Sequence, residues 1–568
     1  MNILDNFRSL MKQKSVDYFI VKDSDEHSSE YVNDYFKFRT KLSGFTGSNG
    51  TLLIGLKEAW LFTDGRYFVQ AQKELEGTDI KLMRMGTSGV PTFKEFLSSL
   101  IKDNVIIGTF GKYISYKDSK ELKIDYFDDG SMFFDSFYMT YGNNYSLLEY
   151  DKTLFSLDYS LSGESSESKL QRVRDNMNKQ HADYVLVSAL DSCMWLLNIR
   201  GKAIPNNPVT YCYILISNDK TIVFIDKFND FHIDDIFEIR SYDDIFGYLK
   251  TICSKTLIFD SRSLCAYYGK LIEEQNNQIF DNDAGVSLMK AIKNPVETQN
   301  IRKVYLKDSC IVSSYLKFIK NSKLDNLNEY NAGCMLDEMR LGEEDCFDLS
   351  FDTISAMGPN AAMMHYSASK DNNSPLYKDN LYLVDSGGQW IGGTTDVTRT
   401  VILGTPTEEM KHDYTLVLKG LLKLQNAVFL EGCTGLTLDM LARESLWKEG
   451  KDYKCGTGHG IGYMLNVHEG PQSIRPRSLA SQNEPAFKPG MIVSDEPGVY
   501  KEGKYGVRLE NILLCVEKFK TDDGLFLGFE PLTYVPFDED LINRDELSAQ
   551  ELDWLDDYQQ KCEYIHSN

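Results

Sequence analysis

Acidic residues at the ends of apolar, strand-like segments most strongly constrain how this chain can fold. Asp385 ends the segment LYLVD, Asp396 begins the alternating segment DVTRTVIL, and Glu496 ends GMIVSDE. Aspartate and glutamate are disfavoured in strands, and burying their charge costs free energy unless a partner is present. The fold must therefore supply each carboxylate with a partner, and a divalent metal ion is one such partner.

The residues between the first two carboxylates, and a further glutamate, extend this pattern. Asp385 is followed by Ser-Gly-Gly, which can turn sharply, so a hairpin is expected to bring Asp385 and Asp396 face to face. Glu510 lies in GVRLENILLCVE (506–517), which predicts one strand with Arg508 on the same face as Glu510. A buried Arg508–Glu510 ion pair is therefore an alternative to metal binding there.

One histidine stands in a glycine-rich segment, Gly-Thr-Gly-His-Gly-Ile-Gly, which spans 456–462 with His459 at its centre. The glycines allow backbone and ligand to approach closely. A structural, hydrogen-bonding histidine is the alternative, and a phosphate loop is disfavoured because the segment lacks the lysine that reaches phosphates. His468 follows in Asn-Val-His-Glu-Gly.

Together these residues form a candidate set of metal ligands: Asp385, Asp396, His459, Glu496 and Glu510. Four carboxylates and one imidazole suit Mn²⁺, Co²⁺ or Zn²⁺. Two such cations about 3.5–4 Å apart share bridging carboxylates and a bridging water, whose pKa they lower until hydroxide is available near neutral pH. The set therefore predicts hydrolytic chemistry.

Composition excludes several other classes of protein. The 568 residues predict about three or four domains, and a net charge of −23 disfavours binding to nucleic acid or anionic membranes. No apolar run approaches the roughly 18 residues of a membrane span, and the N-terminus lacks the apolar core of a signal peptide. Eleven cysteines without a CxxC motif favour the reducing cytosol.

Two segments of the N-terminal half resemble each other. MKQKSVDYFIV (11–21) and MNKQHADYVLV (177–187) share Met, Asp and Tyr at matching offsets, and each predicts a helix that runs into a buried strand. Further short apolar strands follow each copy, so two related α/β units are expected. The alternative is chance similarity over eleven residues. The polar segment LSGESSESK (161–169) is expected to link the two units.

A third unit is predicted to begin near Asn294-Pro295, because proline suits the first turn of a helix. Its first two helices are indicated by apolar residues at helical spacing: Ile301, Val304, Tyr305, Val312, Tyr315, Leu316 and Ile319, then Tyr414, Val417, Leu418, Leu421 and Leu422. Helices packed against the antiparallel strands described above make an α+β domain.

Ordered motifs along nearly the whole chain resemble the three-domain Xaa-Pro aminopeptidases (aminopeptidase P), pita-bread metallopeptidases of family M24B. The resemblance rests on these segments: SEYVNDYFKFRTKLSGFTGSNGTLLI, AWLFTDGRYFVQAQ, DSCMWLLNIRG, NNPVTY, IKNPVE, ISAMGPNAAMMHY, VDSGGQWIGGTTDVTRTV, GTGHGIGYMLNVHEGPQSI, MIVSDEPGVY and GVRLENILL. It implies two creatinase-like α/β domains, at 1–160 and 161–293, followed by a pita-bread catalytic domain at 294–568.

The resemblance also implies roles for the five candidate ligands. Asp385 would bind one metal ion, His459 and Glu496 the other, and Asp396 and Glu510 would bridge both. Glu496 would also be the general base that takes a proton from the bridging water. The implied cofactor is a pair of divalent ions, Mn²⁺ first, with Co²⁺ or Zn²⁺ as alternatives.

Further residues match the positions around the substrate in this family. His365 and His468 would bind the scissile carbonyl and stabilise the oxyanion. Tyr500 and Arg508 match supporting residues near the proline subsite, and Arg66 falls in an N-terminal motif that reaches the substrate. The resemblance implies a cytoplasmic homodimer that acts on peptides with proline at position 2, with no nucleic-acid or membrane partner.

The sequence departs from the family pattern at one position. The family often has His-Gly-Thr-Gly-His, whereas this chain has Cys455 at the first position. The outer histidine is not one of the five ligands, so we expect the metal site to persist and a hydrogen bond near the substrate carbonyl to be lost or replaced by a weaker thiol. Neutral drift between small polarizable side chains is the alternative.

Three rival functions follow from the same family. Prolidase shares the metal site but cleaves only dipeptides and normally lacks the second N-terminal domain. The repeated segment at Met177 indicates such a second domain and so argues against prolidase. Creatinase-type hydrolases share the fold without this ligand set. A metal-free pita-bread module that binds peptides or histones has lost ligands, whereas this chain retains all five.

Overall fold

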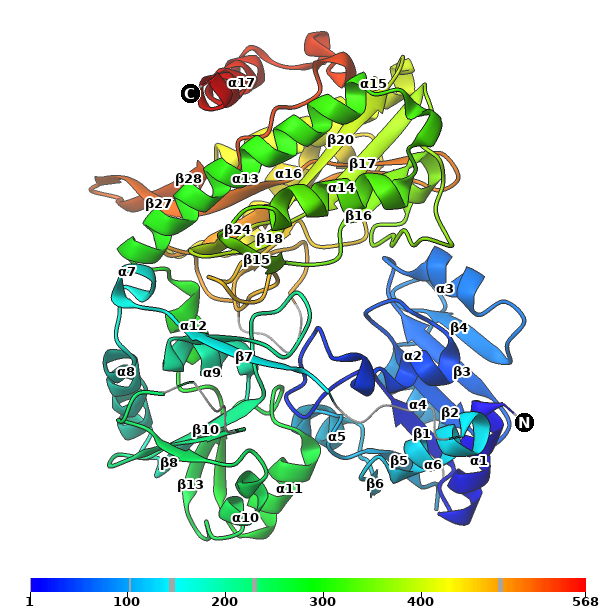
Figure 1. Ribbon diagram of the computed structural model, residues 1–568, viewed down its shortest axis with the longest axis vertical. Coiled ribbons are helices and arrows are strands. Elements are labelled where there is room, and N and C mark those ends of the chain that lie inside the picture. The colour runs from blue at the N-terminus through cyan, green and yellow to red at the C-terminus, as the bar shows by residue number, and fades with distance from the viewer. Residues whose placement is uncertain are drawn as a thin grey trace. The chain divides into compact units, whose positions relative to one another are not determined.

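The computed structural model describes residues 2–101, 104–142, 149–226, 231, 233–478 and 484–567, which form two compact units (Figure 1). The first unit consists of Met1–Leu157 and Glu164–Val286. The second consists of Asp158–Gly163 and Ser287–Asn568. The predicted boundaries at 160/161 and 293/294 stay a prediction.

The first unit contains two six-stranded sheets. The strands of the first, in spatial order, are β4 (Ile80–Arg84), β3 (Ala59–Thr63), β2 (Thr51–Gly55), β1 (Tyr18–Val21), β5 (Ile107–Phe110) and β6 (Tyr126–Asp128). Those of the second are β12 (Glu238–Arg240), β11 (Thr221–Ile225), β10 (Cys212–Ile216), β8 (Tyr184–Val187), β13 (Thr256–Phe259) and β14 (Gln278–Asp281). A smaller antiparallel pair joins β7 (Asp151–Ser156) to β9 (Ile199–Lys202).

The two sheets have the same topology. In each sheet, the strand that ends the repeated segment, β1 or β8, pairs antiparallel with β2 or β10 on one side and parallel with β5 or β13 on the other. Helix α1 (Ile3–Gln13) leads into β1, and α8 (Ser166–Lys179) leads into β8. The prediction of two related α/β units is therefore confirmed.

The remaining helices of the first unit are α2 (Phe38–Ser43), α3 (Phe68–Glu74), α4 (Phe93–Leu100), α5 (Tyr116–Glu121), α6 (Ser131–Tyr141), α9 (Leu190–Leu197), α10 (Asp244–Leu249) and α11 (Ala266–Glu274). Helix α12 (Val286–Ala291) leads from this unit into the second.

The predicted linker at 161–169 is largely helical. It contains the end of α7 (Tyr159–Ser162) and the start of α8. The physical reason is capping, because the Ser165 hydroxyl accepts a hydrogen bond from the amide of Ser168 and satisfies a free donor of the new helix. Helix α7 packs in the second unit, where the carbonyl of Ser162 accepts from the Asn294 side chain at 2.8 Å.

The second unit begins as predicted, with Asn294 as the N-cap and Pro295 at the first turn of α13 (Pro295–Asn321). Its other long helices are α14 (Glu329–Leu341), α15 (Glu408–Gln425), α16 (Gly435–Trp447) and α17 (Ala549–Ser567). Every apolar residue of the two predicted helical faces is buried in α13 or α15.

A three-stranded antiparallel sheet lies at the centre of this unit: β16 (Ile354–Met357), β17 (Asn380–Ser386) and β20 (Val397–Leu403). Tyr382 and Val384 pack in one core with residues of α13 and α14, whereas Leu381 packs with α15. Because side chains alternate along a strand, Asp385 lies on the face opposite to α13 and α14.

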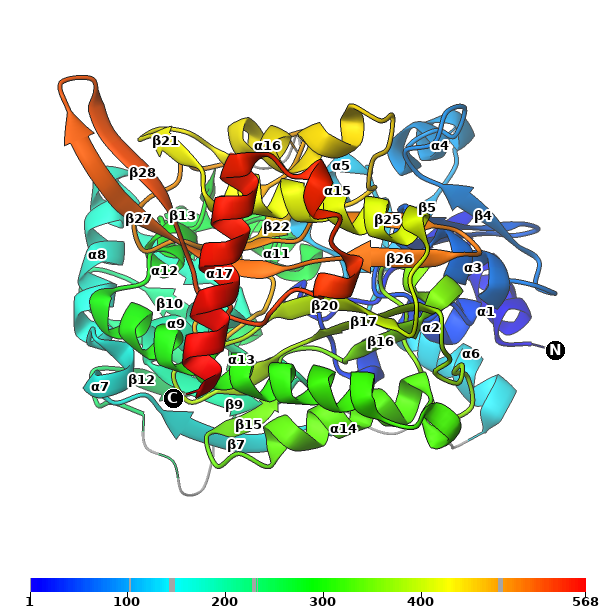
Figure 2. The same cartoon turned by 90° about the horizontal axis from the view of Figure 1, so that it is seen from above.

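A second, four-stranded sheet runs in the order β21 (Val428–Leu430), β28 (Gly524–Pro531), β27 (Asn511–Thr521) and β24 (Ile492–Asp495). Figure 2 shows the β27–β28 hairpin extending beyond the helices of its unit. The short strands are β15 (Cys346–Leu349), β18 (Gly388–Trp390), β19 (Gly393–Thr394), β22 (Gly458–His459), β23 (Ser473–Ile474), β25 (Gly498–Lys501) and β26 (Tyr505–Arg508).

The prediction of one continuous strand over 506–517 is wrong. The segment divides into β26 and β27, and Glu510 lies in the break between them. Its backbone is held by β20 instead, because its amide donates to the carbonyl of Thr398 at 3.1 Å and its carbonyl accepts from Arg399 Nη1 at 2.6 Å. These bonds turn the chain between the two strands.

The predictions on membrane spans and on cysteines concern the described part of the chain. None of the helices in that part has the length and apolar character needed to cross a membrane. All eleven cysteines are free thiols.

Truncation of Leu421 should destabilise the second unit. Leu421 is fully buried in the core between α15 and the sheet, and Leu421→Ala is expected to lower the free energy of unfolding of this unit by about 2–5 kcal/mol. Calorimetric unfolding would measure the change, with Met440→Ala as the control because Met440 is 53% exposed. Equal destabilisation by both variants would contradict this account of the core.

Candidate metal centre

The five candidate ligands all belong to the second unit and stand at the ends of strands. Asp385 lies near the end of β17 and Asp396 directly before β20. His459 ends β22, Glu496 follows β24, and Glu510 lies between β26 and β27. Strand ends hold a side chain rigidly while leaving space beyond the sheet for a ligand.

Pairing of β17 with β20 brings the two aspartates together. The strands are antiparallel, and Asp385 lies opposite Thr398, two residues beyond Asp396. The connection is longer than the predicted hairpin, since β18 and β19 lie within it. Asp385 is 8% and Asp396 4% exposed, so both carboxylates are withdrawn from water.

His459 occupies a place that only glycine neighbours permit. A Cβ on Gly458 would lie 1.9 Å from the carbonyl oxygen of Ser494, and one on Gly460 would lie 2.0 Å from that of Glu469. The histidine Nδ1 lies 2.9 Å from the Gly460 carbonyl, to which it donates as the protonated nitrogen. That tautomer leaves the lone pair on Nε2, the atom that faces the acidic residues.

The ligand atoms converge. His459 Nε2 lies 3.5 Å from Asp396 Oδ2 and 3.4 Å from Glu496 Oε1. Ligand atoms of Asp396, His459 and Glu510 all lie within 4.8 Å of one another, the one such group of three found among the described residues. The structure thus brings together side chains separated by more than a hundred positions in sequence.

Two hydroxyl groups orient the glutamates, and sequence reasoning missed both. Thr398 Oγ1 donates to Glu510 Oε2 at 2.8 Å, and Ser494 Oγ donates to Glu496 Oε1 at 3.1 Å. Thr398 lies two residues after Asp396, and Ser494 two before Glu496. Polar residues at this spacing share the ligand's face of a strand, which is the signal that would have found them.

Burial and mutual repulsion shape the electrostatics of the cluster. Burial raises the pKa of Asp396 and of Glu510 well above that of an ordinary carboxyl group, and neighbouring carboxylates raise both further. Burial raises the pKa of Glu496 to about 7; Arg508 opposes the rise and Asp385 adds to it. The cluster therefore attracts either protons or metal cations.

The donor set fits a divalent cation. Oδ1 of Asp385 is buried and has no hydrogen-bond partner among the described residues, which is costly for a carboxylate oxygen unless a cation takes the place of a donor. The other oxygen, Oδ2, accepts from Arg508 Nη2 at 2.6 Å. Arg508 therefore pairs with Asp385 and not with Glu510, and the alternative of an Arg508–Glu510 ion pair is wrong.

Three of the predicted substrate residues adjoin the ligands. The ring centroids of His468 and His459 are 4.4 Å apart in an edge-to-face arrangement. Arg508 Nη1 donates to the Tyr500 hydroxyl at 2.9 Å, so Tyr500 is linked through Arg508 to Asp385. Burial raises the pKa of Tyr500, which keeps its hydroxyl protonated.

The other two predicted residues, His365 and Arg66, belong to other segments of the chain. His365 is half-buried in the turn after the short helix η3 (Gly358–Ala362), and that helix packs against β26. Arg66 belongs to the first unit, where its guanidinium pairs with Asp64 at 2.8 Å. The roles of both toward a substrate stay predictions.

Cys455, the departure from the family motif, is half-buried and packs against the same core as Tyr500. Its carbonyl accepts from Arg443 Nη2 at 2.6 Å. The effect of the thiol on substrate binding stays a prediction.

Comparison with known proteins gives the class to which this fold and site belong. Residues 299–517 match metallopeptidase family M24, and residues 525–567 match the C-terminal region of peptidase M24. Residues 3–130 and 149–297 each match a creatinase/prolidase N-terminal domain. The predicted fold class, two creatinase-like domains followed by a pita-bread domain, is confirmed.

Relatives that match nearly the whole chain show which group of family M24 it resembles. A probable Xaa-Pro aminopeptidase P from Laccaria bicolor is 38% identical over 98% of this chain and 88% of its own length. The crystal structure of X-prolyl aminopeptidase from Caenorhabditis elegans, described as a cytosolic enzyme with a di-nuclear active site, aligns with a TM-score of 0.91 at 30% identity, over 100% of this chain and 95% of that one. The chain therefore belongs to the Xaa-Pro aminopeptidases of metallopeptidase family M24.

A third match shares only the fold. An Xaa-Pro dipeptidase from Bacillus anthracis aligns with a TM-score of 0.54 at 24% identity, over 99% of its own chain but 66% of this one. About a third of this chain therefore has no counterpart there, as expected if that protein has one N-terminal domain fewer.

The affinity of the centre for metal should rise with pH. In the metal-free protein the carboxyl group of Glu496, with a pKa of about 7, is protonated below that pH, and a cation must displace the proton. We expect the apparent Mn²⁺ affinity to increase about fivefold between pH 6 and pH 7, about twofold between pH 7 and pH 8, and little above pH 8.

Titration calorimetry in two buffers of different ionisation enthalpy would measure the affinity and the protons released. Glu496→Gln, which has no proton to release at this position, should flatten the dependence. Equal affinity at pH 6 and pH 8 in the unsubstituted protein would contradict the prediction.

Proposed function

We propose that this chain is a dinuclear metal-dependent aminopeptidase that hydrolyses the N-terminal Xaa-Pro bond of peptides. The convergence of Asp396, His459 and Glu510 within 4.8 Å, with Glu496 beside His459, is the observation that carries the proposal. The names of the whole-chain relatives support the reaction and the substrate class.

The proposed assignment of ligands follows the resemblance. Asp385 would hold one ion, His459 and Glu496 the other, and Asp396 and Glu510 both, with Mn²⁺ as the first candidate and Co²⁺ or Zn²⁺ as alternatives. When bound, the two ions would supply a nucleophile from water near neutral pH. The buried Oδ1 of Asp385 supports this assignment, since it needs a cation.

Glu496 is the proposed general base. Its side chain is 21% exposed, whereas that of Asp396 is 6% exposed, so Glu496 is the more accessible to a proton donor. Nearby cations would lower its pKa from about 7 and leave it ionised at neutral pH. Ser494 holds one of its oxygens, which fixes the direction from which the carboxylate accepts a proton.

Histidines are the proposed partners of the scissile peptide. His468 and His365 would donate to the carbonyl oxygen as negative charge develops on it. A bond to proline has no N–H, so the departing nitrogen must receive a proton, and His365 with neighbouring groups would supply it. Tyr500, Arg508 and Arg66 are the proposed substrate-binding residues beyond these.

Two properties of the working enzyme are part of the same proposal. We infer a cytosolic location, supported by eleven free cysteines and by the description of the relative from Caenorhabditis elegans. Homodimer formation is proposed from the resemblance alone, and light scattering that finds a monomer would remove it.

Loss of a bridging carboxylate tests the metal centre. Asp396→Ala should reduce bound metal from about two ions per chain to one or fewer, and lower kcat/KM by more than about 10³-fold, because both ions lose a ligand. Metal analysis and release of arginine from Arg-Pro-Pro with Mn²⁺ would measure the two effects.

The matched control is Asp371→Ala, which removes an exposed aspartate from the same unit. Full activity in Asp396→Ala, or no release by the unsubstituted protein with any divalent ion, would overturn the proposed reaction. Hydrolysis of Arg-Pro alone, with Arg-Pro-Pro untouched, would indicate a dipeptidase instead.

Replacement of the proposed base separates proton transfer from metal binding. Glu496→Gln keeps a ligating oxygen but cannot accept a proton, so kcat should fall by about 10²–10⁴-fold while metal content and KM change little. Steady-state kinetics beside metal analysis would measure this. Glu502→Gln, an exposed glutamate in the same unit, should leave kcat unchanged, and an active Glu496→Gln enzyme would exclude Glu496 as the base.

A further inference from the structure

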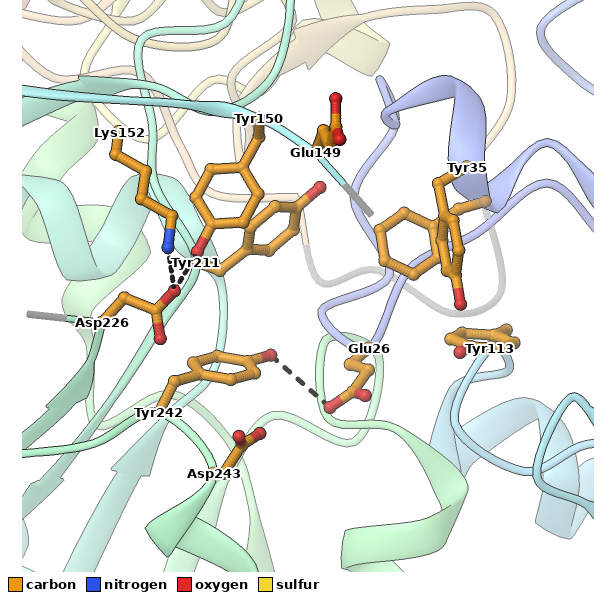
Figure 3. Close-up of a pocket in the computed structure, with 11 residues that line it drawn as sticks. Glu26, Tyr35, Tyr113, Glu149, Tyr150, Lys152, Tyr211, Asp226, Tyr242 and Asp243 are labelled. Atoms are coloured by element: carbon orange, nitrogen blue, oxygen red, sulfur yellow. Dashed lines mark hydrogen bonds and ion pairs between the residues drawn. The ribbon is translucent and has the colours of Figure 1, made fainter. Parts of the chain in front are cut away.

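The first unit contains a cavity of about 620 Å³ that is separate from the metal ligands (Figure 3). The residues that line it come from both halves of that unit: Glu26, Tyr35, Phe36 and Tyr113 from one, and Glu149, Tyr150, Lys152, Tyr211, Asp226, Tyr242 and Asp243 from the other. A volume of this size accommodates a small organic molecule.

Aromatic rings make up a continuous part of the wall. The ring centroids of Phe36 and Tyr113 are 5.4 Å apart, and those of Phe36 and Tyr211 are 6.1 Å apart. From Tyr211 the series continues to Tyr150 at 5.1 Å and to Tyr242 at 6.5 Å. Ring faces attract cations and also cover methylene groups.

Negative charge dominates the same wall. Four carboxylates line the cavity, those of Glu26, Glu149, Asp226 and Asp243, against one lysine. That lysine, Lys152, pairs with Asp226 at 3.1 Å, and Glu26 pairs with Lys112 at 2.9 Å. The side chains of Glu149 and Asp243 have neither a hydrogen bond nor an ion pair within the described part of the chain. Figure 3 shows these two on opposite sides of the Tyr211 and Tyr242 rings.

A buried hydroxyl group also points to a ligand. Tyr211 is 5% exposed, and its hydroxyl has no hydrogen-bond partner among the described residues. Figure 3 shows this hydroxyl directed toward the side of the cavity where Glu149 and Tyr35 lie. Burial raises the pKa of Tyr211, and the nearby charges of Asp25 and Glu26 raise it further, as expected in a negative field.

The chemistry of the wall excludes several classes of ligand. Anions would meet four carboxylates. A hard metal ion needs oxygen ligands that converge on one point, and no three acidic, histidine or cysteine side chains of the described pocket residues do so. An uncharged apolar ligand would gain nothing from Glu149 and Asp243. An organic cation satisfies both the rings and the separated carboxylates.

We propose that this cavity binds a small aliphatic polyamine, whose ammonium groups are met by Glu149 and Asp243 and whose methylene groups lie against the tyrosine rings. Separation of the two carboxylates favours several linked ammonium groups over a single one. The Tyr211 hydroxyl accepts a hydrogen bond from one of them. The site does not depend on the peptidase reaction.

Spermidine is the probe for the first test, with titration calorimetry on the full chain loaded with Mn²⁺ so that the acidic metal centre is occupied. We expect saturable binding of one spermidine per chain. Glu149→Gln combined with Asp243→Asn should weaken it by at least about tenfold, because two Coulomb attractions are lost. Both residues are exposed, so the fold should persist, as an unchanged thermal midpoint would verify.

The matched control is Glu76→Gln with Asp79→Asn, which removes the same charge from exposed positions outside the cavity and should leave the affinity unchanged. Tyr211→Phe, which keeps the ring, should weaken binding by about threefold. Equal weakening by both double variants, or no saturable binding, would overturn the proposal. Tighter binding of Ca²⁺ that competes with spermidine would also overturn it, because the cavity would then be a metal site.

Discussion

Repulsion among four carboxylates held in one buried place is the constraint on which the second unit depends. Beyond the effect of burial, Asp385 and Glu496 raise the pKa of Asp396, and Asp396 raises that of Glu510, while Arg508 is the cation that the structure places beside Asp385. Burying several unpaired charges would cost several kcal/mol for each ion, so the cluster is stable only with bound protons or bound metal. Strand pairing and the close contacts of Gly458 and Gly460 hold the ligands together against this repulsion.

Side chains alternate between the two faces of the central strands, so one face packs in the core while the other faces the candidate metal centre. In β20, Val397 and Val401 pack toward α13 and α14, while Thr398 and Thr400 turn to the other face, where they bond Glu510 and Arg508. The sequence predicted the buried faces because apolar periodicity is a local signal. It did not predict the break at Glu510, because the bonds from β20 that make this break come from residues more than a hundred positions away.

The other features that the sequence predicted also depend on residues close in sequence, whereas those it did not predict depend on distant residues. The repeat at Met11 and Met177 predicted two related units because each copy is a helix followed by a strand, and the two sheets have matching order. The cavity beside Tyr211 was not predicted, since its wall draws on separate short segments that share no motif. A motif marks residues that are close in sequence, whereas a cavity is made by packing of segments that are not.

Hydroxyl groups two residues from a candidate ligand hold the two glutamates of the candidate metal centre in place. One oxygen of each candidate glutamate ligand accepts from a hydroxyl group: Glu510 from Thr398, on the strand that follows Asp396, and Glu496 from Ser494, on the strand that leads to Glu496 itself. A carboxylate fixed in this way loses little conformational entropy when it binds a cation or a proton. The two glutamates differ in exposure: Glu510 is 1% exposed and the side chain of Glu496 is 21% exposed, as expected if both hold metal and Glu496 alone also exchanges a proton.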